Sequence, residues 1–253
     1  MGKVMSRDGT HIDFDRSGEG PPLILVLGAF NDRTTGAPLA SFLKADFTVV
    51  NYDRRGRGQS GDTAPYAIER EIEDLDALIK EVGGSASLLG YSSGGLLALH
   101  AVIKGLSIPK LVLYEAPVMG HDAGLVPPLV DLVLTGRRGD AVEYFQSKFV
   151  GMPEQVVNQL KHAPFRPYLE SIAHTTVYDA TLVCEPPHAN DLARITVPTL
   201  VITGSESQST FLQANESLAS SLPQGQYLCL EGQTHHLDGP VLAPVVRDFL
   251  QAD

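Results

Sequence analysis

The feature that most restricts the fold of this chain is a short stretch, residues 88–96, with the sequence LLGYSSGGL. Its apolar start is typical of a buried strand, and the glycines allow a sharp turn directly into a helix, which we expect over residues 93–104. Gly90, Ser92 and Gly94 fit the G-x-S-x-G pattern of a nucleophile elbow, which exposes a serine hydroxyl at the tip of a strained turn. The alternative is a glycine-rich turn without chemistry, so other parts of the chain must decide.

Composition restricts the class of protein. The chain has 253 residues, of which 43% are hydrophobic and 19% charged, which fits one α/β domain carrying an insertion. No apolar run approaches the roughly 18 residues of a membrane span, and residues 1–15 do not resemble a signal peptide, so we expect a cytoplasmic protein without a membrane partner. A net charge of −11 disfavours nucleic acid. The expected partner is a small molecule; monomer and homo-oligomer both stay open.

Runs that are apolar on both faces recur along the chain and are typical of strands buried between two helix layers. After a predicted hairpin over residues 4–17, these runs cover residues 23–27, 47–52, 86–89, 111–114, 199–202 and 227–230. Helical patterns separate them, most clearly the one-sided apolar stripes over residues 68–82 and 241–250. The alternation predicts an α/β fold with a doubly wound, mostly parallel sheet.

One region, residues 118–190, interrupts the alternation. It contains no buried strand pattern, and we expect short helices over residues 128–134, 140–149, 154–162 and 165–175. We interpret it as a helical cap above the carboxyl edge of the sheet, where open α/β sheets bind ligands, with residues 1–117 and 191–253 forming the core domain. Seven apolar side chains either line a pocket there or form the cap's own core: Met119, Phe145, Phe149, Met152, Phe165, Tyr168 and Tyr178.

Several motifs follow one another in a fixed order: LGAF at residues 27–30, DRRGRGQS at 53–60, the elbow, the helical insertion and a late histidine. This order resembles the alpha/beta hydrolase superfamily over essentially the whole chain. The resemblance implies Ser92 as nucleophile and the Ser93 backbone N–H as one oxyanion donor. Ala29, which follows the position of the family's His-Gly, would be the second donor. Leu27 replaces that histidine, and Phe30 is the fallback donor.

Two further patterns concern cofactors. Residues 56–61, GRGQSG, fit the G-x-G-x-x-G pattern of dinucleotide sites, but residues 62–65 separate them from any helical pattern that would hold a pyrophosphate. A tight structural turn explains the glycines. The histidines show no metal-ligand spacing, and Cys184 and Cys229 form no C-x-x-C. We therefore expect no cofactor and no metal ion.

The general base should be a histidine after the last strand, because serine needs a neutral imidazole to take its proton. The sequence GQTHH at residues 232–236 offers His235 and His236. We choose His235, whose spacing from Gly232 resembles the family's Gly-x-x-His.

The acid departs from the family's commonest pattern, which places an aspartate three residues after the glycine that ends the strand at residues 199–203. That position holds Ser207. Glu206 is one residue out of register, and Asp238 is close to His235 in sequence. We choose Glu115, which follows the strand at residues 111–114, where some superfamily members, including lactone hydrolases, carry their acid. The alternative is that Glu115 only caps the following turn.

A serine nucleophile disfavours the dehalogenase and epoxide-hydrolase branches of the superfamily. The resemblance therefore implies a hydrolase that cleaves a small hydrophobic carboxylic ester or lactone through an acyl-enzyme. Two alternatives stay open: a hydroxynitrile-lyase-like or carbon–carbon-bond-cleaving enzyme with the same triad, and a ligand-binding homologue without catalysis.

Overall fold

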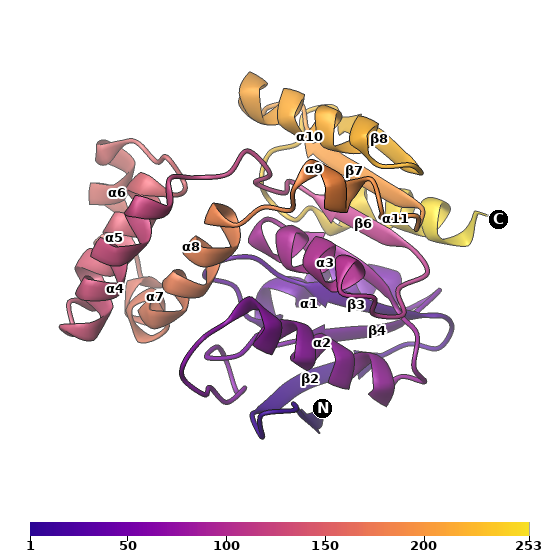
Figure 1. Cartoon of the computed structure of the whole chain (residues 1–253), viewed down its shortest axis with the longest axis horizontal. Helices are drawn as coiled ribbons and strands as arrows, with labels where there is room; N and C mark the ends of the chain where they lie inside the picture. The colour runs from indigo at the N-terminus through magenta and orange to yellow at the C-terminus, as the bar shows by residue number, and fades with distance from the viewer. Residues whose placement is uncertain (253) are drawn as a thin grey trace.

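An eight-stranded sheet forms the centre of the computed structural model, which describes residues 1–252 (Figure 1). Its strands are β1 (Gly2–Met5), β2 (His11–Ser17), β3 (Pro22–Val26), β4 (Thr48–Tyr52), β5 (Ser87–Tyr91), β6 (Leu111–Tyr114), β7 (Thr199–Gly204) and β8 (Gly225–Leu230). They lie in the order β1-β2-β4-β3-β5-β6-β7-β8. Only the pairings of β2 with β1 and with β4 are antiparallel. The predicted α/β fold with a mostly parallel sheet is confirmed.

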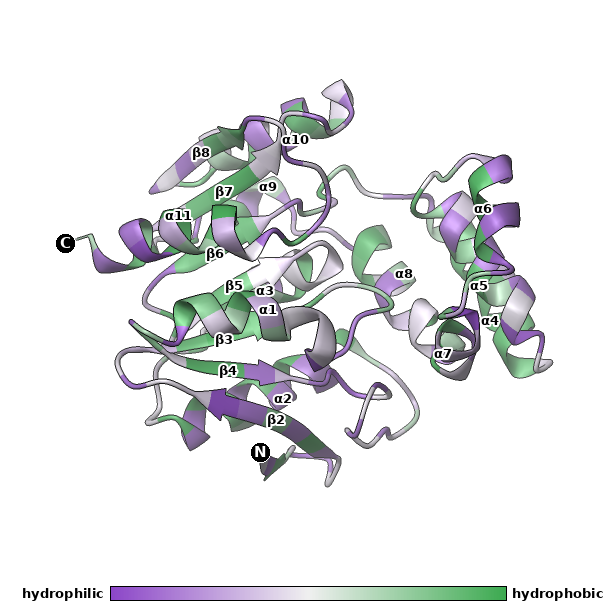
Figure 2. Cartoon of the chain, turned by 180° about the vertical axis from the view of Figure 1, so that it is seen from behind, coloured by the Kyte–Doolittle hydropathy of each residue, from purple (hydrophilic) through white to green (hydrophobic). Residues whose placement is uncertain are grey.

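Helices cover both faces of the sheet. Helices α1 (Arg33–Leu43) and α11 (Gly239–Gln251) lie on one face, and α2 (Ile68–Glu81), α3 (Ser93–Ile103) and α10 (Ser209–Ser221) on the other (Figures 1 and 2). Side chains of a strand alternate between the two faces, so Leu23 and Leu25 join the core under α1 and α11, whereas Ile24 and Val26 join the core under α2 and α3. The central strands are therefore apolar on both sides.

Two core helices were not among those expected. Helix α1 contains Gly36 and Pro38, and α10 is rich in serine, so neither has strong helix propensity. The Asp32 side chain caps α1 by accepting the Thr34 N–H at 2.8 Å. Packing then holds both helices, since Leu39 of α1 is 1% exposed and Leu218 of α10 is 5% exposed, and both belong to the buried core.

Residues 118–190, which we call the helical segment, contain helices and no strand. The helices are η1 (Ala123–Leu125), α4 (Val126–Leu134), α5 (Arg138–Lys148), α6 (Glu154–Leu160), α7 (Arg166–Ser171), η2 (Ala173–Thr175), α8 (Thr176–Cys184) and α9 (Ala189–Leu192). The predictions matched α4, α5, α6 and, as one helix, α7 with η2, but missed α8 and α9. Helices α4–α7 stand to one side of the sheet, and α8 lies between them and α3 (Figure 1).

The strand order creates a crevice at the carboxyl edge of the sheet. From β3 the chain passes to β4 on one side and later to β5 on the other, so the connections after β3 and β5 run in opposite directions. Such a switch point is where open α/β sheets bind ligands. Gly28 follows β3 and Ser92 follows β5, so both lie at this point. None of the helices in the described part of the chain combines the length and apolar character needed to cross a membrane.

Candidate active site

Ser92 sits in a strained turn between β5 and α3. Its backbone angles are φ 54° and ψ −132°, and residues other than glycine rarely adopt a positive φ of this kind. Gly90 and Gly94 must be glycines because neighbouring backbone atoms lie where a side chain would begin. A Cβ on Gly94 would lie 2.1 Å from the Val26 carbonyl oxygen, and a Cβ on Gly90 would lie 2.6 Å from Gly95 Cα. The turn therefore has the geometry that the sequence pattern predicts.

The structure brings Ser92, His235 and Glu115 together in one hydrogen-bonded series. His235 Nε2 lies 3.1 Å from Ser92 Oγ, and His235 Nδ1 lies 3.1 Å from Glu115 Oε2. The three residues come from the end of β5, the end of β6 and the loop between β8 and α11. The carboxylate is 1% exposed, whereas half of the His235 side chain is open to solvent. This is the geometry of a nucleophile, a base and an orienting acid.

Glu115 is held by two donors that the sequence analysis did not identify. The Gly204 N–H donates to Glu115 Oε1 at 2.7 Å, and the Ser207 hydroxyl lies 2.9 Å from both carboxylate oxygens. Ser207 occupies the position at which the family's commonest pattern has an aspartate, and here it contacts Glu115 from the loop after the neighbouring strand β7. The serine at position 207 was the one sign of this contact in the sequence. A small hydroxyl donor there can bind a carboxylate that comes from another strand. In the described residues no hydrogen bond joins Glu206 or Asp238 to His235.

Two tyrosines at the ends of β5 and β6 hold the histidine loop. The Tyr91 hydroxyl donates to the His235 carbonyl at 2.6 Å, and the Tyr114 hydroxyl donates to the Thr234 carbonyl at 2.5 Å and to the His236 carbonyl at 3.2 Å. Burial and then the nearby Glu115 carboxylate raise the pKa of both hydroxyls, so they stay protonated donors at neutral pH. From the sequence, Tyr91 was expected only as part of the elbow motif and Tyr114 only as the end of a strand.

The predicted oxyanion residues, Ala29 and Ser93, line the same cavity as Ser92. Ser93 is the first residue of α3, where backbone N–H groups have no partner within the helix. The loop of Ala29 packs directly on Ser92, since a Cβ on Gly28 would lie 2.6 Å from Ser92 Cβ and 3.1 Å from its Oγ. The next residue, Phe30, has a φ of 61°. This left-handed bend turns the chain away from β3.

A cavity of about 660 Å³ opens onto Ser92. Of the apolar side chains proposed for it, Met119, Phe145, Phe149 and Met152 line it, and Phe165, Tyr168 and Tyr178 do not. Phe145 and Phe149 serve both roles, because they are 3% and 8% exposed and stack at 5.2 Å between ring centroids. Polar side chains also reach the cavity: Asn31, His121, Lys148, Glu206 and Gln208. The helical segment and the loop after β7 thus enclose a mainly apolar space.

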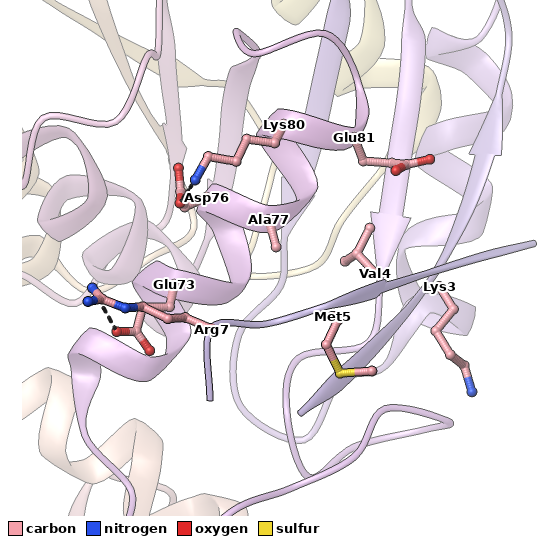
Figure 3. A pocket seen from close by; sticks show the side chains of 9 residues that line it. All are labelled: Lys3, Val4, Met5, Arg7, Glu73, Asp76, Ala77, Lys80 and Glu81. Atoms are coloured by element: carbon pink, nitrogen blue, oxygen red, sulfur yellow. Dashed lines mark hydrogen bonds and ion pairs between the residues drawn. The ribbon is translucent and has the colours of Figure 1, made fainter. Parts of the chain in front are cut away.

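A second hollow, of about 630 Å³, lies between β1 and α2, away from Ser92 (Figure 3). It is lined by Lys3, Val4, Met5, Arg7, Glu73, Asp76, Ala77, Lys80 and Glu81. Two ion pairs join charged groups of the lining, Lys80 with Asp76 at 2.5 Å and Arg7 with Glu73 at 3.9 Å. The lining contains no serine, cysteine or histidine, so this hollow holds no serine or cysteine nucleophile with a histidine base beside it.

The glycine motif at residues 56–61 forms a tight turn. A Cβ on Gly58, whose φ is 52°, would lie 2.2 Å from the Asp53 carboxylate, and that carboxylate accepts the Gln59 N–H at 2.9 Å. Helix α2 begins only at Ile68, so the helix that follows the motif in the chain does not start at these glycines. Across residues 1–252, no three side chains of the His, Cys, Asp and Glu types are grouped so as to hold a metal ion.

Comparison with known proteins identifies the family. The sequence profile described as the alpha/beta hydrolase family matches residues 23–246. The crystal structure of an alpha/beta hydrolase from Sphaerobacter thermophilus DSM 20745 is 44% identical, with a TM-score of 0.92 over 99% of this chain and 100% of that chain. Proline iminopeptidase PfmaB of Pestalotiopsis fici is 26% identical over 245 residues, 86% of each chain. The enol-lactonase from Burkholderia xenovorans LB400 is 22% identical, with a TM-score of 0.75 over 99% of this chain and 100% of that chain, and shares the fold. This chain belongs to the alpha/beta hydrolase family.

Proposed function

We propose that the protein is a serine hydrolase that cleaves small hydrophobic carboxylic esters or lactones through an acyl-enzyme. The observation that carries the proposal is the series Ser92, His235 and Glu115 at the wall of a mainly apolar cavity. In this proposal residues 1–117 and 191–253 form the catalytic core domain, and the helical segment is a cap that encloses the substrate.

The proposed first step is attack of Ser92 Oγ on the substrate carbonyl while His235 Nε2 takes the hydroxyl proton. Glu115 accepts the hydrogen bond from Nδ1–H, which fixes the tautomer with a free Nε2 and stabilises the imidazolium that forms. Because Oε1 of Glu115 is already bound by Gly204 and Ser207, the carboxylate keeps its orientation during this transfer.

Negative charge develops on the carbonyl oxygen in this step. In the proposal the Ala29 and Ser93 N–H groups donate to that oxygen, and the N-terminus of α3 adds its positive dipole. The imidazolium then gives its proton to the leaving alkoxide, which separates from an ester and stays attached to the acyl chain in a lactone. Water, activated by His235, hydrolyses the acyl-enzyme and releases the acid.

The cavity favours uncharged substrates. The aromatic rings of Phe145, Phe149 and Phe211 contribute apolar surface around Ser92. The net charge of −11 repels anionic substrates at long range. Aryl esters, short acyl esters and lactones fit these conditions better than dicarboxylates or phosphoesters.

The test is a panel of p-nitrophenyl butyrate, phenyl acetate, δ-valerolactone and a cyanohydrin, read beside labelling by a fluorophosphonate. The 26% identical proline iminopeptidase makes proline p-nitroanilide the comparison substrate for peptidase activity. We expect ester and lactone turnover, label on Ser92, and loss of both in a folded Ser92→Ala variant. Label on Ser93, turnover of the cyanohydrin or the anilide alone, or an active Ser92→Ala variant contradicts the proposal.

A further inference from the structure

Four buried charged residues form a cluster beside the loop that follows β3. Arg54 pairs with Glu71 through two hydrogen bonds of 2.6 Å, and its Nη1 donates to Asp179 Oδ1 at 2.8 Å. Arg57 Nη2 donates to Asp179 Oδ2 at 2.6 Å. All four residues are 1% exposed or less, and the two positive charges balance the two negative ones. Three of them come from the core, and Asp179 comes from α8 of the helical segment.

The two arginines also hold the backbone carbonyls next to the proposed oxyanion donor. Arg57 Nη1 donates to the Gly28 carbonyl at 2.7 Å, and Arg54 Nη1 donates to the Leu27 carbonyl at 3.1 Å. The Gly28 carbonyl and the Ala29 N–H belong to one planar trans peptide, in which they point in opposite directions. Holding the carbonyl at Arg57 therefore turns the Ala29 N–H away from Arg57, and this peptide packs against Ser92.

Asp179 also reaches the second proposed donor. The Ser93 hydroxyl donates to Asp179 Oδ1 at 2.7 Å, and Ser93 carries the other proposed oxyanion N–H. Burial raises the pKa of the Asp179 carboxyl, but the charges of Arg57 and Arg54 and the Ser93 hydroxyl outweigh burial, so its pKa lies below the ordinary value. The carboxylate is thus charged at neutral pH and accepts all of these bonds.

Stability alone gives a poor account of this cluster. Replacing buried ion pairs by apolar side chains of similar volume is often neutral or stabilising. Arg57 Nε is fully buried and has no acceptor among residues 1–252, which adds to the free energy needed to bury this side chain. Leu27 offers no polar side chain to hold the loop. The arginines bind its Leu27 and Gly28 carbonyls, and Asn31 adds a longer backbone bond of 3.4 Å to the Gly28 carbonyl and a side-chain bond of 2.7 Å to the Ala29 carbonyl.

We propose that Arg57 and Asp179 are positioning residues that orient both oxyanion donors, Ala29 through Arg57 and Ser93 directly. The guanidinium also polarises the Gly28–Ala29 peptide and strengthens its N–H as a donor. Because Asp179 lies on α8, correct seating of this helix on the core becomes a condition for fast acylation. The proposal rests on the serine hydrolase function proposed above.

The experiment compares Arg57→Met, Asp179→Asn and the charge-balanced Arg57→Met/Asp179→Asn with the wild-type chain. The readouts are kcat and KM for p-nitrophenyl butyrate and the inhibition constant of a trifluoromethyl ketone, which forms a tetrahedral oxyanion adduct on serine. Since the donors act on the oxyanion, we expect kcat to fall by about 10- to 100-fold, with KM nearly unchanged. This decrease does not exceed the one expected when a whole oxyanion donor is removed. The inhibition constant should rise by the same factor as kcat/KM falls.

Arg55→Met is the matched control. Arg55 is also fully buried, but its hydrogen bonds go to Asp74 at 2.7 Å, to Asp8 at 3.0 Å and to the Arg70 carbonyl at 3.0 Å. We expect Arg55→Met to lower the melting temperature as Arg57→Met does, while kcat and the inhibition constant stay at their wild-type values.

The outcomes separate this proposal from the function on which it rests. An active Ser92→Ala variant overturns the proposed function itself. If Ser92→Ala is inactive while Arg57→Met or the charge-balanced double variant is folded and has the wild-type kcat, only the positioning role is overturned. If kcat falls by the same factor in Arg55→Met as in Arg57→Met, the positioning role is overturned as well. If the arginine variants do not fold, Ser93→Ala decides, because it removes one hydroxyl and keeps the backbone donor: a wild-type kcat there overturns the role of Asp179.

Discussion

The Glu115→Gln variant tests the acid, because it replaces one carboxylate oxygen by a nitrogen of similar size. The Gly204 N–H, 2.7 Å from Oε1, is a main-chain donor that cannot rotate away. The new carboxamide therefore keeps its oxygen at Gly204 and turns its NH2 group toward His235 Nδ1, 3.1 Å away. The imidazole must then accept at Nδ1 and carry its proton on Nε2. In that tautomer His235 cannot take the proton of Ser92.

The size of the effect follows from the two orientations of the amide. The flipped orientation restores the correct tautomer but leaves the buried Gly204 N–H without an acceptor, which costs about 1–3 kcal/mol. This preference lowers the competent population by roughly 5- to 150-fold. The loss of the negative charge that stabilises the imidazolium lowers kcat further. We expect kcat to fall on the order of 10⁴-fold, as when the carboxylate of a serine triad is neutralised, or about 5.5 kcal/mol.

The assay is kcat for p-nitrophenyl butyrate, with a thermal melt to show that the variant is folded. Glu206→Gln is the matched control, because Glu206 lines the same cavity, is exposed and should keep nearly full activity. Ser207→Asp should partly rescue Glu115→Gln, since Ser207 Oγ is 2.9 Å from both carboxylate oxygens. A Glu115→Gln variant that keeps more than about a tenth of kcat, or a larger loss in Glu206→Gln or in Asp238→Asn, refutes the reasoning.

Three further predictions concern Gly28, Tyr114 and Asp179. Gly28→Ala places a Cβ 2.6 Å from Ser92 Cβ, so kcat/KM for the same ester should fall at least about 100-fold; wild-type turnover would mean that the loop moves freely. Tyr114→Phe removes the hydroxyl whose one proton is shared between the Thr234 and His236 carbonyls, so a urea titration should show a loss of about 1 kcal/mol, and an unchanged midpoint would contradict this. The pKa of Asp179 lies below its ordinary 3.8, so in acid the unfolded chain binds more protons than the folded one. Its contribution to stability is present above pH 3.8 and is lost as the pH falls through the lower folded value, so the wild-type urea midpoint should drop more steeply with acid than that of Asp179→Asn; parallel curves would refute this.

The sequence determined most of the strands of the sheet and several of its helices, because the signals for them are local. Runs such as residues 23–27 and 199–202 are apolar on both faces, as a strand between two helix layers requires. The stripe of α2 and the glycines of the elbow are equally local. Helices α1, α8 and α10 were missed because their own propensity is weak and packing against the sheet or against α3 stabilises them.

At the candidate site the sequence indicated Ser92 and His235 through short motifs and favoured Glu115 over Glu206 and Asp238 as the acid, without showing what Glu115 contacts. The strand order supplies those contacts: β6 lies between β5 and β7, with Tyr114 opposite Tyr91 on one side and Ile202 on the other. This register puts the end of β6 beside the ends of both neighbours, where a carboxylate meets the histidine loop.

The cluster of Arg54, Arg57 and Asp179 was beyond the reach of the sequence for the same reason. The Arg57–Asp179 contact joins positions 122 residues apart, and the His235–Ser92 contact joins positions 143 residues apart. No pattern in a local window carries such a pairing. It arises when the sheet and the helical segment pack together, because burying their apolar faces fixes which distant polar groups meet.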